Sequence, residues 1–129
     1  GELSRALLAL KVVLAQAGPV GMYVFDEVDT GVGGGVAEGI GQKLAAVATH
    51  HQVLCITHLP QVAVYADRHL RVHKAVEGGQ TYSGIAVLDA GGREEEIARM
   101  LGGMEITDTT RALARELLFQ AGERALAAR

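Results

Sequence analysis

Two adjacent carboxylates, Asp26 and Glu27, directly follow the apolar run from Met22 to Phe25. Successive side chains of a strand point to opposite faces, so the two carboxylates cannot both enter a core. At the carboxyl end of a parallel strand both can reach the crevice where α/β sheets bind ligands. One carboxylate can then hold Mg²⁺, which prefers oxygen ligands, and the other can take a proton from water. A solvated acidic turn is the alternative that the pair alone leaves open.

A histidine follows a second apolar run, Val53 to Ile56, after one intervening residue, Thr57. Alone, His58 fits a capping residue at a strand end as well as a group that orients water or contacts a γ-phosphate. The 31 positions from Glu27 to His58 are enough for a glycine turn, one helix and a return strand. That is one βαβ crossover, which brings both strand ends to the same edge of the sheet.

The elements that position these residues follow from periodicity and from glycine punctuation. The apolar runs 22–25 and 53–56 predict two short strands buried on both faces. The alternating segments 68–74 and 81–88 predict a hairpin with a loop of more than two residues over 75–80. Helices are expected at 4–17, 36–49, 59–66 and 94–101, and from Thr107 or Asp108 to about residue 127. The order predicts an α/β fold: a mixed, largely parallel sheet with flanking helices, followed by a hairpin and C-terminal helices.

Composition bounds the class of protein. The chain has 129 residues, of which 49% are hydrophobic and 21% charged, so a disordered chain is excluded. Its apolar runs are far shorter than the roughly 20 residues of a membrane helix, and no leader-like succession opens it, so no membrane partner is expected. The single cysteine, Cys55, fits a reducing cytosol and a cytoplasmic location. A net charge of −3 gives no support to a self-sufficient DNA-binding module.

Several segments together resemble the later half of the head of SMC-like, ABC-type ATPases. They are GELSRALLALKVVLA, VFDEVDTGVGG, CITHLPQVAVYAD, REEEIARMLGG and ITDTTRALARELL. The resemblance covers nearly all of residues 1–129, as the C-terminal portion of a single head domain. Gly1 and Glu2 resemble the end of the ABC signature, and Asp26-Glu27 resemble the Walker B pair. Residues 28–33 occupy the D-loop, and His58 matches the switch histidine.

The resemblance implies ATP and Mg²⁺ as ligands and a role for each matched residue. It implies that Asp26 holds Mg²⁺, that Glu27 polarises the attacking water and that His58 contacts the γ-phosphate. The residues implied at the nucleotide and the dimer interface are Gly1, Glu2, Asp29, Thr30 and Gly31. It further implies that the head pairs head to tail with a second head around two ATP molecules. The implied role is double-strand break repair by recombination, with DNA bound through the complete, nucleoid-associated protein.

The sequence departs from the family pattern in two places. No GxxxxGK[ST] motif occurs, and the nearest candidate, GIGQKL at Gly39–Leu44, lacks the glycine before its lysine and the hydroxyl after it. The P-loop of the family lies far earlier, so an N-terminal half bearing it is expected as partner, and the chain alone is expected to be inactive. Gly33 stands where the D-loop of relatives ends in Asp, so that contact falls to backbone or to Asp29.

Two other readings stay open. In the first, the chain is a non-catalytic interaction or scaffold domain, and the acidic pair is only a turn. In the second, the acids line a pocket like that of a response regulator, for which no suitable lysine follows a later strand. The remaining histidines are interpreted as surface or edge residues rather than metal ligands: His50, His51, His69 and His73.

Overall fold

A computed structural model describes residues 21–27 and 29–127 of the chain. The expected helix 4–17, Gly1 and Glu2 lie outside the described residues. The described chain forms two compact units, one up to Ala66 and again from Glu116 onward, the other Asp67–Arg115. Its elements are β1 (Met22–Asp26), α2 (Gly34–Ala48), β2 (Gln52–Ile56), α3 (Pro60–Ala63), β3 (Leu70–Glu77), β4 (Gln80–Val87), α4 (Ala90–Gly102) and α5 (Asp108–Ala127).

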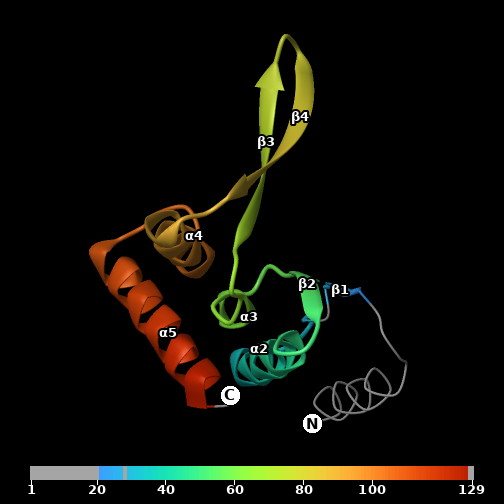
Figure 1. The fold of residues 1–129 in the computed structure, drawn as a ribbon. Coiled ribbons are helices and arrows are strands. Elements are labelled where there is room, and N and C mark those ends of the chain that lie inside the picture. The colour runs from blue at the N-terminus through green and yellow to red at the C-terminus, as the bar shows by residue number, and fades with distance from the viewer. Residues whose placement is uncertain (1–20, 28, 128–129) are drawn as a thin grey trace. The chain divides into compact units, whose positions relative to one another are not determined.

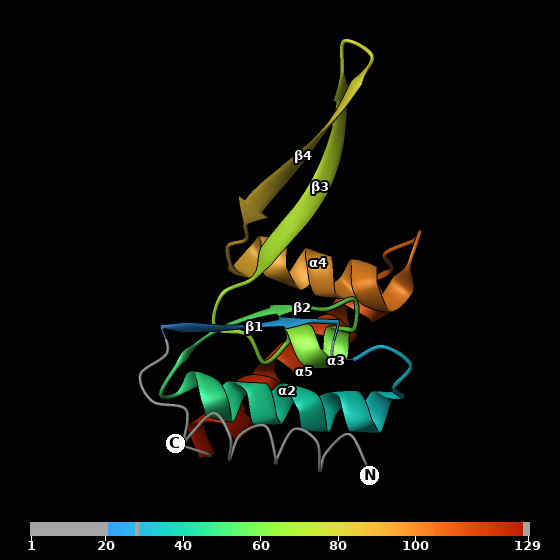
Figure 2. The same ribbon diagram turned by 90° about the vertical axis from the view of Figure 1, so that its right-hand side faces the viewer.

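The first unit is built on a parallel pair of strands. β1 pairs with β2 in a register that sets Met22 opposite Gln52 and Asp26 opposite Ile56. The connection between the strands is α2, which lies along one face of the pair (Figures 1 and 2). Parallel neighbours need such a crossover, and the predicted βαβ unit is confirmed.

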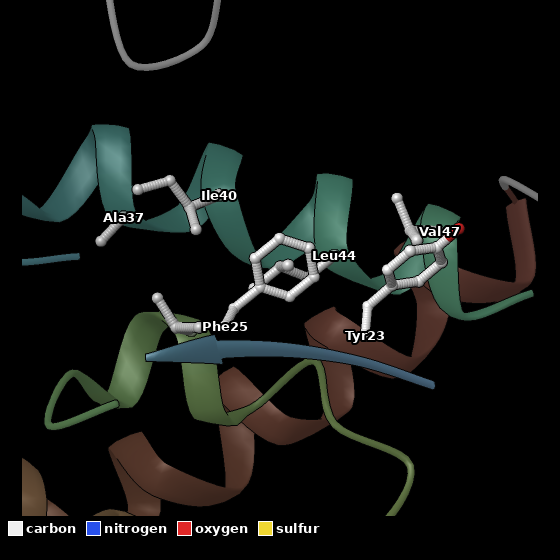
Figure 3. Close-up of a cluster of buried hydrophobic side chains, with 7 residues drawn as sticks. Tyr23, Phe25, Ala37, Ile40, Leu44 and Val47 are labelled. Atoms are coloured by element: carbon white, nitrogen blue, oxygen red, sulfur yellow. The ribbon is translucent and has the colours of Figure 1, made fainter. Parts of the chain in front are cut away.

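The core of this unit lies between β1 and α2. Tyr23 and Phe25 point from β1 toward α2 (Figure 3), which contributes Ala37, Ile40, Leu44 and Val47, with Val62 of α3 completing the cluster. The opposite face of β1 is open among the described residues, since Met22 is 46% and Val24 56% exposed. The expectation that this strand is buried on both faces is therefore wrong for the described structure. Burial of Tyr23 and Phe25 on one face is what fixes β1 on α2.

The four described strands form two separate sheets of two strands each, not one largely parallel sheet. β3 and β4 pair in antiparallel register, with Glu77 opposite Gln80. Their connection is only Gly78-Gly79, shorter than predicted, with φ of +58° and +77°. A two-residue turn that matches strand twist requires positive φ at both positions, and glycine adopts it at no steric cost.

An arginine-bound carboxylate links β3 to α4 within the second unit. The Glu96 side chain is 7% exposed and accepts hydrogen bonds from Arg99 Nε at 2.8 Å and Nη2 at 2.5 Å. Arg71 of β3 lies 3.4 Å away through its own Nε. The hydrogen bond from Arg99 lowers the pKa of the Glu96 carboxyl, opposed by burial. Burying this charge is tolerated because it is paired.

The last helix, α5, begins where the sequence predicts. The Thr107 hydroxyl accepts a hydrogen bond from the Thr110 N–H at 3.1 Å, as an N-cap does. Ala114 and Ala121 are its most buried residues, whereas Leu113 is exposed. Near its end Arg124 pairs with Glu38 of α2 and donates to the Tyr65 hydroxyl at 3.1 Å. None of the described helices is long and apolar enough to span a bilayer.

The close approach of α2 to α3 depends on Gly41, which gives a stability prediction. A Cβ at this position would lie 2.5 Å from Cδ2 of Tyr65 and 3.0 Å from the Gln61 carbonyl oxygen. We expect Gly41→Ala to lower the free energy of unfolding by about 1–2 kcal/mol, because overpacking outweighs the gain in helix propensity. Gly39→Ala, in the same helix with no atom within 4 Å of its Cβ, should instead be neutral or stabilising. Denaturant unfolding of both variants checks this, and equal effects would contradict it.

Candidate active site

The backbone brings the two strand ends to one edge of the parallel pair. The Glu27 N–H donates to the Ile56 carbonyl oxygen at 3.0 Å, one residue beyond the ladder of β1 and β2. Asp26-Glu27 and Thr57-His58 therefore leave the same carboxyl edge. Asp26, Glu27 and His58 are all exposed there. In open α/β sheets this edge is where ligands bind.

Glu27 is held in an unusual backbone conformation. Its φ is +51°, and it is the one non-glycine residue with positive φ among residues 21–27 and 29–127. The left-handed region costs a non-glycine residue about 1–2 kcal/mol. Its carbonyl oxygen accepts hydrogen bonds from the Thr30 N–H at 3.2 Å and the Thr30 hydroxyl at 2.9 Å. Bonds on both sides of the residue thus fix the Glu27 backbone while its side chain stays exposed.

Asp29 lies two residues further along the same loop, and its side chain is fully buried. Its Oδ2 accepts a hydrogen bond from the Thr57 hydroxyl, whose oxygen in turn accepts from the Leu59 N–H at 3.0 Å. Its Oδ1 is buried and has no hydrogen-bond partner. Nδ1 of His58 lies 3.9 Å from that Oδ1. The loop after β1 and the residues after β2 are therefore joined through side chains as well as backbone.

The buried Asp29 carboxylate also affects the pKa of the neighbouring Cys55 thiol. Cys55, partly buried in β2, has its pKa raised to about 11, first by burial and second by the negative charge of Asp29. The thiol is thus protonated at neutral pH and is not a nucleophile in this site.

The structure brings together most of the predicted site residues. Asp26, Glu27, Asp29 and His58 lie at one edge, and Thr30 caps the turn that Gly31, with φ of +76°, continues. Sequence reasoning missed Thr57, although a hydroxyl residue directly before a strand-end histidine is a usable signal. Of the other histidines, His50 and His73 are exposed as expected. His51 and His69 are partly buried. The His51 ring packs edge-on against the Tyr23 ring, with 5.1 Å between the two ring centroids.

The donor set is suited to a metal that arrives with a phosphate ligand. No group of three or more His, Cys, Asp or Glu side chains within the described ranges could hold a metal ion. Mg²⁺ is typically bound by one or two carboxylates together with substrate phosphates, and an exposed carboxylate at a sheet edge, such as Asp26, fits this mode. Glu27 lies directly beside it, with an exposed side chain on a backbone fixed by hydrogen bonds.

Comparison with solved structures defines the class of fold. The chain is similar to a solved structure described under ATP-driven dimerization and DNA-stimulated activation of SMC ATPases, with a TM-score of 0.56. The match covers 78% of this chain and 61% of that chain at 19% sequence identity. The described α/β fold thus resembles part of an SMC ATPase head. No protein-family model matches the chain.

Sequence comparison is more specific. The chain is 53% identical over 118 residues to the DNA repair protein RecN of Streptomyces coelicolor and 51% identical over 123 residues to that of Xylella fastidiosa. It is 47% identical over 123 residues to RecN of Bacillus subtilis. These matches cover 92–95% of this chain but only 21–22% of the relatives. The chain is therefore homologous to one segment of RecN and spans about a fifth of the length of these curated relatives.

Proposed function

We propose that the chain is the Walker B, D-loop and switch-histidine part of an SMC-like ATPase head that binds and hydrolyses ATP. The observation that carries the proposal is the shared edge of β1 and β2, where Asp26, Glu27 and His58 emerge together. Similarity to RecN over nearly the whole chain supports it. The strained Glu27 backbone is a second support, because such strain gathers at functional sites.

In this proposal Glu27, His58 and Asp26 each have a different role in ATP hydrolysis. Glu27, fixed at φ +51°, accepts the proton of the water that attacks the γ-phosphate. His58, 65% exposed, donates to a phosphoryl oxygen as charge builds on it. Asp26 is the residue that would hold Mg²⁺. When bound at Asp26, Mg²⁺ would neutralise negative charge on the phosphates of ATP.

The site needs groups that these residues do not provide. The chain has no GxxxxGK[ST] sequence, whose backbone N–H groups and lysine cradle the phosphates. We assign these groups to an N-terminal P-loop half of the same head. The remaining contacts to nucleotide and to a second, identical head are assigned to Gly1, Glu2 and the loop Asp29, Thr30 and Gly31. By the same reasoning the complete protein acts on DNA in double-strand break repair by recombination, in the nucleoid of the cytoplasm.

A chimera tests the proposal. This chain replaces the matching segment of Streptomyces coelicolor RecN, with which it is 53% identical. We expect Mg²⁺-dependent ATP hydrolysis at a rate within about tenfold of the unaltered relative, because the catalytic carboxylates and histidine are all supplied by this chain. The same relative lacking the segment should be inactive.

The controls separate the two readings of the chain. The unaltered relative, measured in parallel, fixes the reference rate. A chimera that folds and binds ATP but does not hydrolyse it would instead support a non-catalytic interaction domain. Circular dichroism and ATP binding by calorimetry report folding and binding independently of turnover.

A further inference from the structure

We infer that Asp29 is a positioning residue for His58: held by Thr57, its carboxylate accepts a hydrogen bond from Nδ1 of His58 and so directs Nε2 toward the phosphate. This inference rests on the proposed function and assigns to Asp29 a role within its own chain. The proposed function alone gives this loop residue only a place in the contact to nucleotide and to the second head. Its complete burial argues for an inward-facing role.

The Asp29 carboxylate has an incomplete set of hydrogen bonds. A buried carboxylate has two oxygens to satisfy, and leaving one without a donor is costly. Oδ2 receives the Thr57 hydroxyl, but Oδ1 has no hydrogen-bond partner. Buried polar atoms without partners are uncommon in native proteins, and a catalytic role is one of the reasons for which they persist.

The His58 ring is placed to supply the missing hydrogen bond to Asp29. Nδ1 of His58 is 3.9 Å from Oδ1, about an ångström longer than a hydrogen bond. The His58 ring is 65% exposed, so rotation of its side chain is not opposed by packing. The neighbouring Thr57 is already bonded to the same carboxylate, which fixes the backbone from which His58 departs.

A hydrogen bond from His58 to Asp29 has a chemical consequence for the other ring nitrogen. Hydrogen bonding at one ring nitrogen determines which nitrogen is presented to a ligand. With Nδ1–H on Asp29, Nε2 becomes the outward atom. A carboxylate on Nδ1 also stabilises the positively charged ring, which can donate from Nε2 to a phosphoryl oxygen.

The experiment uses the chimera described above and measures steady-state ATP hydrolysis. Asp29→Asn removes the charge, and Thr57→Val removes the hydroxyl with little change in shape. We expect both to lower kcat by about 10–100-fold, the effect typical of losing a group that orients a ligand, with little change in KM. Thr57→Ser, which keeps the hydroxyl, should restore the wild-type rate. Thr49→Val is the matched control, because its hydroxyl contacts only the Ala46 carbonyl outside the site.

Action through His58 is tested by combining substitutions. If Asp29 works by orienting His58, Asp29→Asn should cost nothing further in a His58→Ala background. Multiplying losses in the double variant would overturn the inference, and so would wild-type kcat for both Asp29→Asn and Thr57→Val. Should Thr57→Val fail to fold, Asp29→Asn and the double variant still decide. Failure of the proposed function differs: Glu27→Gln would then turn over like the wild type, or the chimera not at all.

Discussion

Replacing Glu27 with Gln in the chimeric head is expected to slow ATP hydrolysis by about 10²–10⁴-fold while ATP binding persists. The amide keeps nearly the shape of the carboxylate but cannot accept a proton from water. Removing a negative charge near the γ-phosphate should leave ATP affinity unchanged or raise it, because repulsion falls. Under the proposed pairing of heads, the ATP-bound dimer should then accumulate.

The backbone at Glu27 makes this substitution informative. Hydrogen bonds from the Thr30 N–H and hydroxyl to its carbonyl, and from its N–H to Ile56, hold the residue at φ +51°. Glutamine can occupy the same conformation at a similar cost, so the fold should not respond. Glu27→Gly removes the side chain and relieves the strain, so it should be at least as stable as the wild type yet equally inactive. Stability and chemistry are thereby separated at one position.

Single-turnover rates, ATP binding by calorimetry and dimerisation by light scattering are the measurements. Glu105→Gln, an exposed carboxylate outside the site, is the matched control and should be silent. A solvated acidic turn predicts that Glu27→Gln is silent too. Wild-type turnover by that variant would show that another residue is the base.

The positions of the strand ends could be predicted because they depend on local signals. The runs from Met22 and Val53 are too short and too apolar for surface helices, and each ends in polar residues. The spacing between them then requires a crossover, and the parallel register of Asp26 with Ile56 follows. The hairpin strands were predictable in the same way, from alternation.

Burial of β1 on both faces was wrong for a physical reason. A continuous apolar run has the same sequence whether or not other parts of a protein cover its second face. Tyr23 and Phe25 meet α2, whereas Met22 and Val24 have no such cover among the described residues. Which face is covered depends on tertiary neighbours that the run itself does not encode.

The early start of α4 was missed because its first turn contains glycines. The sequence predicts this helix only from residue 94, and each of the two preceding glycines, Gly91 and Gly92, costs a helix about 1 kcal/mol relative to alanine. The structure offsets this with the Asp89 side chain, which accepts from the Gly92 N–H at 2.7 Å. An N-cap of this kind stabilises a helix by a comparable amount. Asp89 is recognisable in the sequence as a possible N-cap. The sequence does not show whether its stabilising effect outweighs the cost of the two glycines.

The contact between Asp29 and Thr57 could not be predicted from local sequence signals. The two residues are 28 positions apart, and their meeting requires both the parallel register and the turn after Glu27. Sequence placed Asp29 in a loop that contacts ligand and partner, and gave no sign that its carboxylate is buried. The edge of the site could be predicted, whereas its internal hydrogen bonds could not.

Asp26→Asn should fail differently from Glu27→Gln, because it acts on metal binding before chemistry. Asp26 ends β1 with an exposed side chain and is the carboxylate assigned to Mg²⁺. Asparagine keeps the shape but loses the charge that a hard divalent ion requires. Substituting residues that only support metal ligands typically costs 10–100-fold in metal affinity, so removing a ligand's charge should cost at least about tenfold.

The measurement is ATP affinity with Mg²⁺ and with a chelator present. For the wild-type chimera, adding Mg²⁺ should tighten ATP binding, and Asp26→Asn should lose at least about tenfold of that affinity. With the metal removed, the two proteins should bind ATP alike, because the substitution then takes away only a charge that repels phosphate. Glu27→Gln is the matched control and should keep the Mg²⁺ effect. If Asp26→Asn keeps the Mg²⁺ effect as well, Asp26 is not the metal ligand.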